Sequence, residues 1–234
     1  MKVSIFQPTY LSWLGFYKAI DWSNVFVFLD DVQFENHSWQ SRNRIKSAND
    51  ELVLTVPIIR NFPQLINEVK INYSQDWIKK HLGSIQRNYC KAPFFKEFFP
   101  QLEAIYQSRP QKLIELNIKI IKSVCEFLEI KTDFHYSSEF NVQNLHKNDK
   151  LIAMLKKLNA SQYIYAEGSA EYMQEALKDY QSIGVKLTPL KFVHPHYNQP
   201  YGEFVSHLSI IDIIFNCGRE KTISIIKNIN LLEK

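Results

Sequence analysis

Paired acidic residues stand where an apolar segment ends, within the first 46 residues of the chain. Asp30 and Asp31 directly follow the run VFVFL at 25–29, and Gln33 comes two positions later. Two carboxyl groups held close together raise the pKa of one of them, which suits general acid or base catalysis and also Mg²⁺ binding. We interpret Asp30 and Asp31 as candidate catalytic residues and Gln33 as a candidate substrate-binding residue. The structural alternative is an Asp-initiated turn after a strand.

A basic segment, WQSRNRIK at 39–46, places three cations within five residues. Arginine binds phosphate or carboxylate in a bidentate fashion, whereas lysine acts as a point charge. We therefore predict a basic loop in which Arg42, Arg44 and Lys46 hold an anionic group and Asn43 orients the substrate. The alternative interpretation is a solvated basic face.

A third candidate is the segment QPTYLSWLG at 7–15, which is predicted to leave a strand and enter a helix. Unpaired N–H groups at a helix N-terminus favour phosphate or carboxylate, so Gln7 and Tyr10 are candidate substrate-binding residues. A proline turn followed by an aromatic core plug is the alternative. His81 lies on a predicted helix and is a candidate general base or an ordinary structural imidazole. No metal site is predicted, because the His-Pro-His motif at 194–196 has no third ligand at recognisable spacing.

These side chains need elements to position them, and the first 31 residues indicate a βαβ unit. Residues 3–6 and 25–29 are short apolar runs, and between them apolar residues recur at helical spacing over 11–20. In open parallel sheets, ligands bind outside the carboxyl ends of the strands. Gln7 and the Asp pair emerge at such ends, so we expect them to converge with the basic loop on one crevice.

The rest of the chain continues the alternation of helices and strands. Strands are predicted over 52–59, 162–165 and 185–190, and helices over 77–89, 102–128, 149–158, 170–180 and 209–215, with Gly218 as a left-handed C-cap. The predicted fold class is α/β, with a Rossmann-like open, mostly parallel sheet flanked by helices. We expect a single domain over 1–234, in which 74–130 forms a mainly helical insertion.

The composition is that of an ordinary globular protein. With 234 residues, of which 45% are hydrophobic and 22% charged, the chain can bury a sizeable core and is not disordered. The net charge of +4 favours anionic partners without indicating nucleic acid. Three widely spaced cysteines argue against a disulfide framework, and no segment has the character of a signal peptide or a membrane span. We therefore expect a cytoplasmic protein and make no prediction of its oligomeric state.

Seven motifs, spread over nearly the whole chain, point together to one known family. They are IFQPTYLSWLGFYKAI at 5–20, FVFLDDVQF at 26–34, WQSRNRIK at 39–46, LTVPI at 54–58, the W-x-x-x-H of Trp77 and His81, NYCKAPFF at 88–95 and LSIIDIIFNCG at 208–218. In this combination the chain resembles the WbqC-like proteins, which are found among bacterial polysaccharide and O-antigen biosynthesis genes.

The resemblance implies a transferase that moves an acyl or aminoacyl group, such as glycyl, onto the amine of a nucleotide-linked sugar. The implied partners are that sugar and an acyl carrier protein that supplies the acyl group as a thioester, with no other cofactor. In this scheme Asp30 or Asp31 takes the proton from the acceptor amine. Arg42, Arg44 and Lys46 hold diphosphate or carboxylate groups.

Two other functions stay open. The order of strand, proline, helix start and strand is similar to that of adenylating nucleotidyltransferases, although WLGF at 13–16 lacks the histidines of their His-x-Gly-His motif. In that case Asp30 and Asp31 would hold Mg²⁺ and the basic residues would hold ATP. The other alternative is a non-catalytic subunit that docks onto a pathway enzyme through an aromatic surface.

Overall fold

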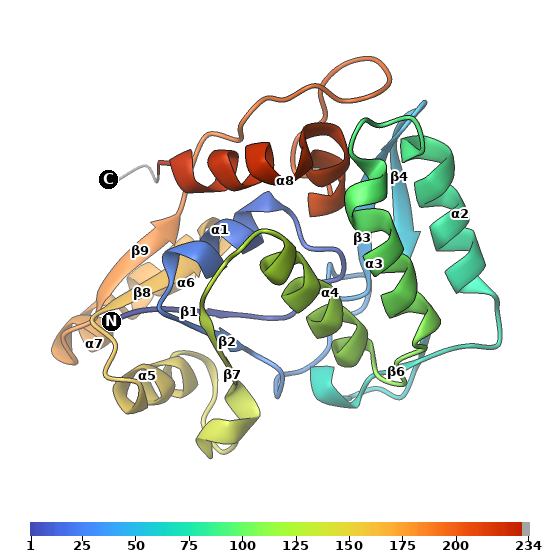
Figure 1. Ribbon diagram of the computed structural model, residues 1–234. Helices are drawn as coiled ribbons and strands as arrows, with labels where there is room; N and C mark the ends of the chain where they lie inside the picture. The colour runs from blue at the N-terminus through green and yellow to red at the C-terminus, as the bar shows by residue number, and fades with distance from the viewer. Residues whose placement is uncertain (231–234) are drawn as a thin grey trace.

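A five-stranded parallel sheet forms the centre of the computed structural model, which describes residues 1–230 (Figure 1). Its spatial order is β7-β2-β1-β8-β9, and every neighbouring pair is parallel. The strands are β1 (Lys2–Phe6), β2 (Val25–Phe28), β7 (Asp133–Tyr136), β8 (Gln162–Ala166) and β9 (Lys186–Leu190). Helices flank this sheet, so the predicted α/β fold with a Rossmann-like parallel sheet is confirmed.

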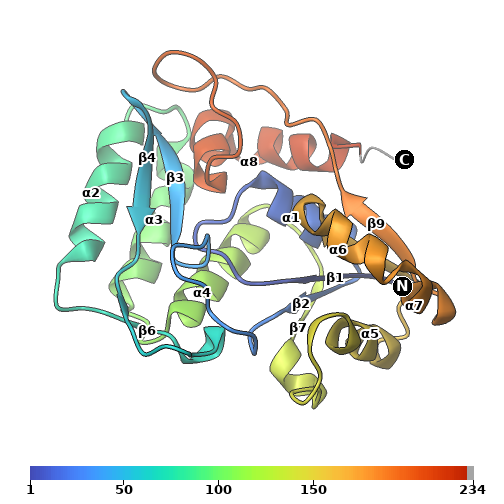
Figure 2. The same ribbon diagram turned by 180° about the vertical axis from the view of Figure 1, so that it is seen from behind.

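The two faces of the sheet are buried by different helices, because side chains alternate along each strand. Val3, Ile5, Val25 and Val27 belong to the cluster packed against α5 (Lys147–Lys157), α6 (Ala170–Glu175) and α7 (Leu177–Ser182). Phe26 and Phe28 face the larger cluster formed with α1 (Leu14–Trp22), α4 (Leu113–Phe127) and α8 (Ile210–Asn228). Figures 1 and 2 show these two helical layers from opposite sides. A sheet covered on both faces explains why β2 reads as an uninterrupted apolar run.

A second body of structure packs beside the sheet. It contains the antiparallel hairpin of β3 (Arg42–Ser47) and β4 (Asp50–Thr55), the short pair β5 (Ile58–Ile59) and β6 (Lys70–Ile71), and the helices α2 (Trp77–Tyr89) and α3 (Phe95–Gln107). The predicted helix over 77–89 is confirmed by α2. No helix within residues 1–230 has the length and apolarity needed to cross a membrane.

The single helix predicted over 102–128 is wrong, because two helices occupy this stretch. α3 ends at Gln107 and α4 begins at Leu113. Pro110 has no N–H to donate to a helix, and a proline disfavours the helical conformation of the residue before it. That residue, Arg109, has a φ of 45°. The apolar periodicity continues across the break, which is why it did not reveal the turn.

The basic loop predicted at 39–46 is also wrong from Arg42 onward, because this part forms β3. Asn43 and Ile45 point inward and are buried, and Arg44 between them is half-exposed. Charged side chains on the outer face hide the alternation that marks a strand. Gly218 has the predicted positive φ of 74°, but its ψ of 175° is not that of a left-handed C-cap, and α8 continues beyond this residue across a kink.

A buried aromatic cluster ties the N-terminal loop to the helices. The hydroxyl of Tyr10 is 2.8 Å from Nδ1 of His81 and also contacts the hydroxyl of Tyr106, and the edge of His81 packs on Trp77. Burial lowers the pKa of His81 to about 4, although a backbone hydrogen bond with Thr55 opposes this shift. The imidazole is therefore neutral at pH 7 in the folded protein.

We predict that the protein loses stability as the pH falls from 7 to 5. The folded-state pKa of His81 lies below its unfolded value of about 6.5, so the unfolded state binds more protons in this window. The expected loss from His81 is about 2 kcal/mol in the free energy of unfolding, measured by urea titration at each pH. The pKa of His194 is also lowered to about 4, by burial and by His207, but this side chain is only partly buried, so its contribution to the loss is smaller. In the His81→Asn variant, the free energy of unfolding should depend less on pH, because the contribution of His81 is removed. An unchanged pH dependence would contradict this assignment.

Candidate functional site

A pocket of about 810 Å³ opens at the carboxyl edge of the parallel sheet. The chain passes from β1 to its neighbour β2 on one side and returns later to β8 on the other, so the order reverses between β1 and β8. Open parallel sheets bind ligands at such switch points. The lining comes from the ends of four strands and the segments that follow them: Ile5, Phe6, Gln7, Leu29, Val32, Tyr163, Ala166, Glu167, Gly168, Ser169 and Leu190.

One side of the pocket, here called the aromatic end, consists of Trp13, Trp39, Arg44 and His207. The guanidinium of Arg44 lies 5.4 Å from the centre of the Trp39 ring, and the rings of Trp13 and His207 are 4.9 Å apart. Trp39 is 49% exposed, so about half of its surface is free. Burial and the charge of Arg44 lower the pKa of His207. This end therefore offers aromatic surface beside a permanent cation.

The absence of a side chain at Gly15 allows the Trp13 ring to lie where it does. A Cβ atom at this position would stand 2.3 Å from the ring. Trp13 also stacks on Phe192 with ring centres 5.7 Å apart. The irregular segment that follows β9 thus reaches the start of α1 and covers this side of the pocket. The same segment contributes His207 to the aromatic end.

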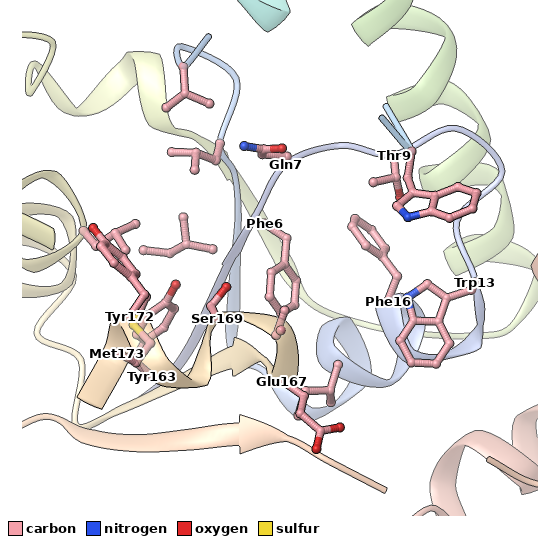
Figure 3. A pocket seen from close by; sticks show the side chains of 18 of the residues that line it. Phe6, Gln7, Thr9, Trp13, Phe16, Tyr163, Glu167, Ser169, Tyr172 and Met173 are labelled. Carbon is pink, nitrogen blue, oxygen red and sulfur yellow. The ribbon is translucent and has the colours of Figure 1, made fainter. Parts of the chain in front are cut away.

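The opposite side, here called the apolar end, is formed by Leu29, Leu151, Tyr172 and Met173. All four belong to the hydrophobic cluster on the α5–α7 face of the sheet. Figure 3 shows Tyr172 and Met173 on one side of Phe6, with Trp13 and Phe16 on the other. Phe6 and Gln7, at the end of β1, therefore stand between the two ends of the pocket.

Buried amide side chains hold the loop after β1 that forms the pocket floor. The amide nitrogen of Asn43 donates to the carbonyl oxygens of Tyr10 and Leu11 at 3.0 and 2.9 Å. The amide nitrogen of Asn117 donates to the carbonyl of Pro8 at 3.1 Å. These bonds satisfy backbone groups that have no partner in a regular element. Asn43, predicted to orient the substrate, lines the pocket but commits its amide nitrogen to the protein.

The acidic pair after β2 lies against η2 (Ser137–Phe140) and α5 rather than in the pocket itself. Both oxygens of Asp30 accept hydrogen bonds, Oδ1 from Ser137 and from the backbone of Ser138, and Oδ2 from the Ser138 hydroxyl. Asp31 forms an ion pair with Lys150 at 2.7 Å, in which the side chains are 4% and 6% exposed. Lys150 lines the pocket, so Asp31 contacts a pocket-lining residue but does not line the pocket itself.

The two carboxylates differ in whether both of their oxygens have hydrogen-bond partners. Oδ2 of Asp31 is buried and has no hydrogen-bond partner among residues 1–230, whereas both oxygens of Asp30 are occupied. In the same described part of the chain, no three His, Cys, Asp or Glu residues gather closely enough to hold a metal ion.

Of the ten residues predicted from the sequence, the pocket lining includes Gln7, Asn43 and Arg44. Seven others lie outside it: Tyr10, Asp30, Asp31, Gln33, Arg42, Lys46 and His81. Lys46 is fully buried and donates to the carbonyl of Glu203 at 2.6 Å, and His81 is enclosed with Tyr10. Gln33 is exposed, and Arg42 lies 5.7 Å from the Trp39 ring centre. The expected convergence on one crevice is therefore found for the loop after β1 and for part of β3.

Sequence reasoning missed several residues of the pocket. They include Lys147, Lys150, Glu167, Ser169, Tyr172 and His207. For Glu167 and Ser169 a signal was present, because EGS at 167–169 comes one residue after the strand predicted over 162–165 and leaves the sheet at the same edge as Gln7. No sequence pattern marks His207, which the irregular segment after β9 brings against Trp13.

Comparison with known proteins relates most of the chain to one family. The model of the WbqC-like protein family matches residues 7–224. An uncharacterized protein of Mycobacterium tuberculosis, Rv1507c, is 30% identical to the chain over 223 residues, which cover 94% of this chain and 95% of that protein. No solved structure matches the chain. Every pocket-lining residue from Gln7 onward falls inside the family match.

We predict that the Asp31→Asn variant is destabilised by about 3–5 kcal/mol, because it leaves the buried ammonium of Lys150 without a countercharge. The measurement is the free energy of unfolding in urea. The double variant Asp31→Asn with Lys150→Met removes both charges and should recover most of this loss.

The matched control is Glu167→Gln, which breaks an ion pair with Lys191 whose side chains are 53% and 42% exposed. An exposed pair is worth about 0–1 kcal/mol, so this variant should retain nearly all of its stability. Equal losses in Asp31→Asn and Glu167→Gln would show that burial does not distinguish the two pairs.

Proposed function

The chain belongs to the WbqC-like protein family, and from this premise we propose that it is a transferase of bacterial surface-polysaccharide biosynthesis. The proposed reaction moves an acyl or aminoacyl group, such as glycyl, onto the amine of a nucleotide-linked sugar. The observation that carries this proposal is the pocket at the switch point between β1 and β8.

The size and lining of the pocket support a nucleotide-linked ligand. A volume of about 810 Å³ lies within the range of small-molecule sites, which is about 300–1,000 Å³. Nucleobases stack on aromatic side chains, and diphosphates bind arginine in a bidentate fashion. Trp13, Trp39 and Arg44 supply both kinds of group. Gln7 lies between the two ends of the pocket, where the nitrogen of its amide can orient the sugar while the oxygen accepts from Gln40 (Figure 3).

The proposed chemistry is attack of the sugar amine on the carbonyl carbon of an acyl thioester carried by an acyl carrier protein. A C–N bond forms and the C–S bond breaks, so the products are an amide and the free thiol of the carrier. The nitrogen loses one proton, which passes to a base, and the departing thiolate takes up one proton. No oxidant or metal is needed to balance this step.

Of the predicted acidic pair, Asp31 is the better candidate for the base. Its Oδ2 oxygen has no partner among the described residues, and its ion-pair partner Lys150 lines the pocket. Both oxygens of Asp30 are already occupied by hydrogen bonds. General-base catalysis is worth about 10²–10⁴-fold in rate, so loss of this carboxylate should reduce turnover by that factor.

The test measures ligand binding by thermal shift and calorimetry with a panel of nucleotide-linked amino sugars, and product formation by mass spectrometry with acyl thioester donors. A ligand present at 100 times its Kd should stabilise the protein by about 2.7 kcal/mol. Binding of ATP that depends on Mg²⁺, without binding of any nucleotide-linked sugar, would instead favour the adenylating alternative. Absence of binding to every member of both sets would leave the non-catalytic subunit.

A pair of glycines provides matched variants for this test. Gly168 lines the pocket and Gly83 lies on α2 outside it, and at both positions a Cβ atom meets nothing within 4 Å. Gly168→Trp should abolish binding of the sugar nucleotide, because the indole occupies the pocket. Gly83→Trp should bind as the wild type does. Equal binding by both variants would remove the pocket from the proposal.

A further inference from the structure

The two ends of the pocket differ in the ligand chemistry that they favour. At the aromatic end, Trp39 is half-exposed beside the guanidinium of Arg44, and the backbone carbonyl of Arg44 accepts from Ser209 at 2.9 Å. That bond fixes the irregular segment carrying His207 against β3. Aromatic surface next to a planar cation suits a flat heteroaromatic ring joined to phosphates.

At the apolar end, the walls are mainly hydrocarbon, although Lys147, one turn before Leu151 on α5, also lines the pocket and is exposed. Leu151 and Met173 are almost fully buried, and Leu29 and Tyr172 pack against the same cluster. An apolar lining of this kind binds hydrocarbon by excluding water from it. It therefore suits the carbon chain of an acyl group.

Two cations that line the pocket, Lys150 and Arg44, also differ in how strongly their ion-pair partners hold them. Lys150 at the apolar end is held by Asp31 in a pair whose side chains are 6% and 4% exposed, and its ammonium also donates to the Asp31 carbonyl at 3.2 Å. Arg44 pairs with Glu51 at 2.8 Å, but these side chains are 27% and 36% exposed. Solvent screens the second pair, so an incoming phosphate can replace Glu51 at little cost. Arg44 is thus a cation that a phosphate at the aromatic end can reach, whereas Lys150 stays committed to Asp31.

Resting on the proposed function, we propose that the pocket is divided into two subsites by Phe6 and Gln7. The nucleoside diphosphate binds at the aromatic end, with its base on Trp39 and a phosphate on Arg44. The acyl group binds at the apolar end among Leu29, Leu151, Tyr172 and Met173. The sugar amine and the acyl carbonyl then meet next to Gln7, where the new amide bond forms.

Calorimetry with two separate sets of probes tests this division. The first set is uridine diphosphate, thymidine diphosphate and guanosine diphosphate. The second set is S-acyl pantetheine thioesters with acyl chains of two, four and eight carbons. Trp39→Ala and Arg44→Gln should each weaken binding of the preferred diphosphate by about tenfold or more, because a stacking face or a bidentate contact is lost. Binding of the acyl-pantetheines should stay unchanged.

Leu29→Trp should have the opposite pattern, because the larger side chain fills the apolar end. It should weaken binding of the acyl-pantetheines, most for the longest chain, and leave diphosphate binding unchanged. The matched controls are Arg60→Gln, an exposed arginine outside the pocket, and Leu187→Trp, a partly buried leucine of the same hydrophobic cluster that does not line it. Both controls should bind the two sets of probes as the wild type does.

The outcomes separate this inference from the proposed function. If the wild type binds neither set of probes, the proposed transferase fails together with the division. If the wild type binds both sets, but Trp39→Ala and Arg44→Gln weaken the acyl-pantetheines or Leu29→Trp weakens the diphosphate equally, the transferase stands and the division is overturned. Binding of diphosphates without any acyl-pantetheine overturns the assignment of the apolar end.

Discussion

The parallel pairing of β1 with β2 on one side and β8 on the other is the constraint on which the rest of this structure depends. Parallel strands place all their carboxyl ends at one edge of the sheet, and here the chain that follows β1 goes to one face while the chain that follows β8 goes to the other. α1, which follows β1, covers one face of the sheet, whereas α6, which follows β8, packs on the other. The segments that follow β1 and β8 therefore diverge at the carboxyl edge of the sheet, and the pocket lies between them.

A pocket lined by irregular segments needs its backbone groups satisfied by side chains, and buried amides perform this task here. Asn43 and Asn117 bind carbonyl oxygens of the loop after β1, and Gln40 donates to Gln7 at 2.7 Å. These residues come from β3, the turn before β3 and α4, so the hairpin beside the sheet and a helix on the sheet together shape the floor of the pocket. The motif WQSRNRIK thus serves the site by positioning a neighbouring loop as well as by supplying Arg44.

Burial separates groups that are adjacent in the sequence and look equivalent there. Asp30 is saturated by Ser137, Ser138 and Asn67, while Asp31 shares a charge pair with Lys150 and keeps one oxygen without a partner in the described chain. Arg44 reaches the pocket, but Lys46, two residues further along the same strand, is fully buried against the segment that contains Glu203. These differences depend on which element packs over each side chain.

The sequence by itself determined the parallel α/β architecture, the strand ends at Gln7 and Asp30, and the WbqC-like family, because strand periodicity and long motifs are local properties of the chain. It did not reveal β7, the break between α3 and α4, or the strand character of 42–47. Only the tertiary structure decided that Trp13 meets His207 and that Asp31 meets Lys150, 119 residues apart. Such contacts arise from how helices and loops pack onto the sheet, and a pattern of neighbouring residues carries no record of that packing.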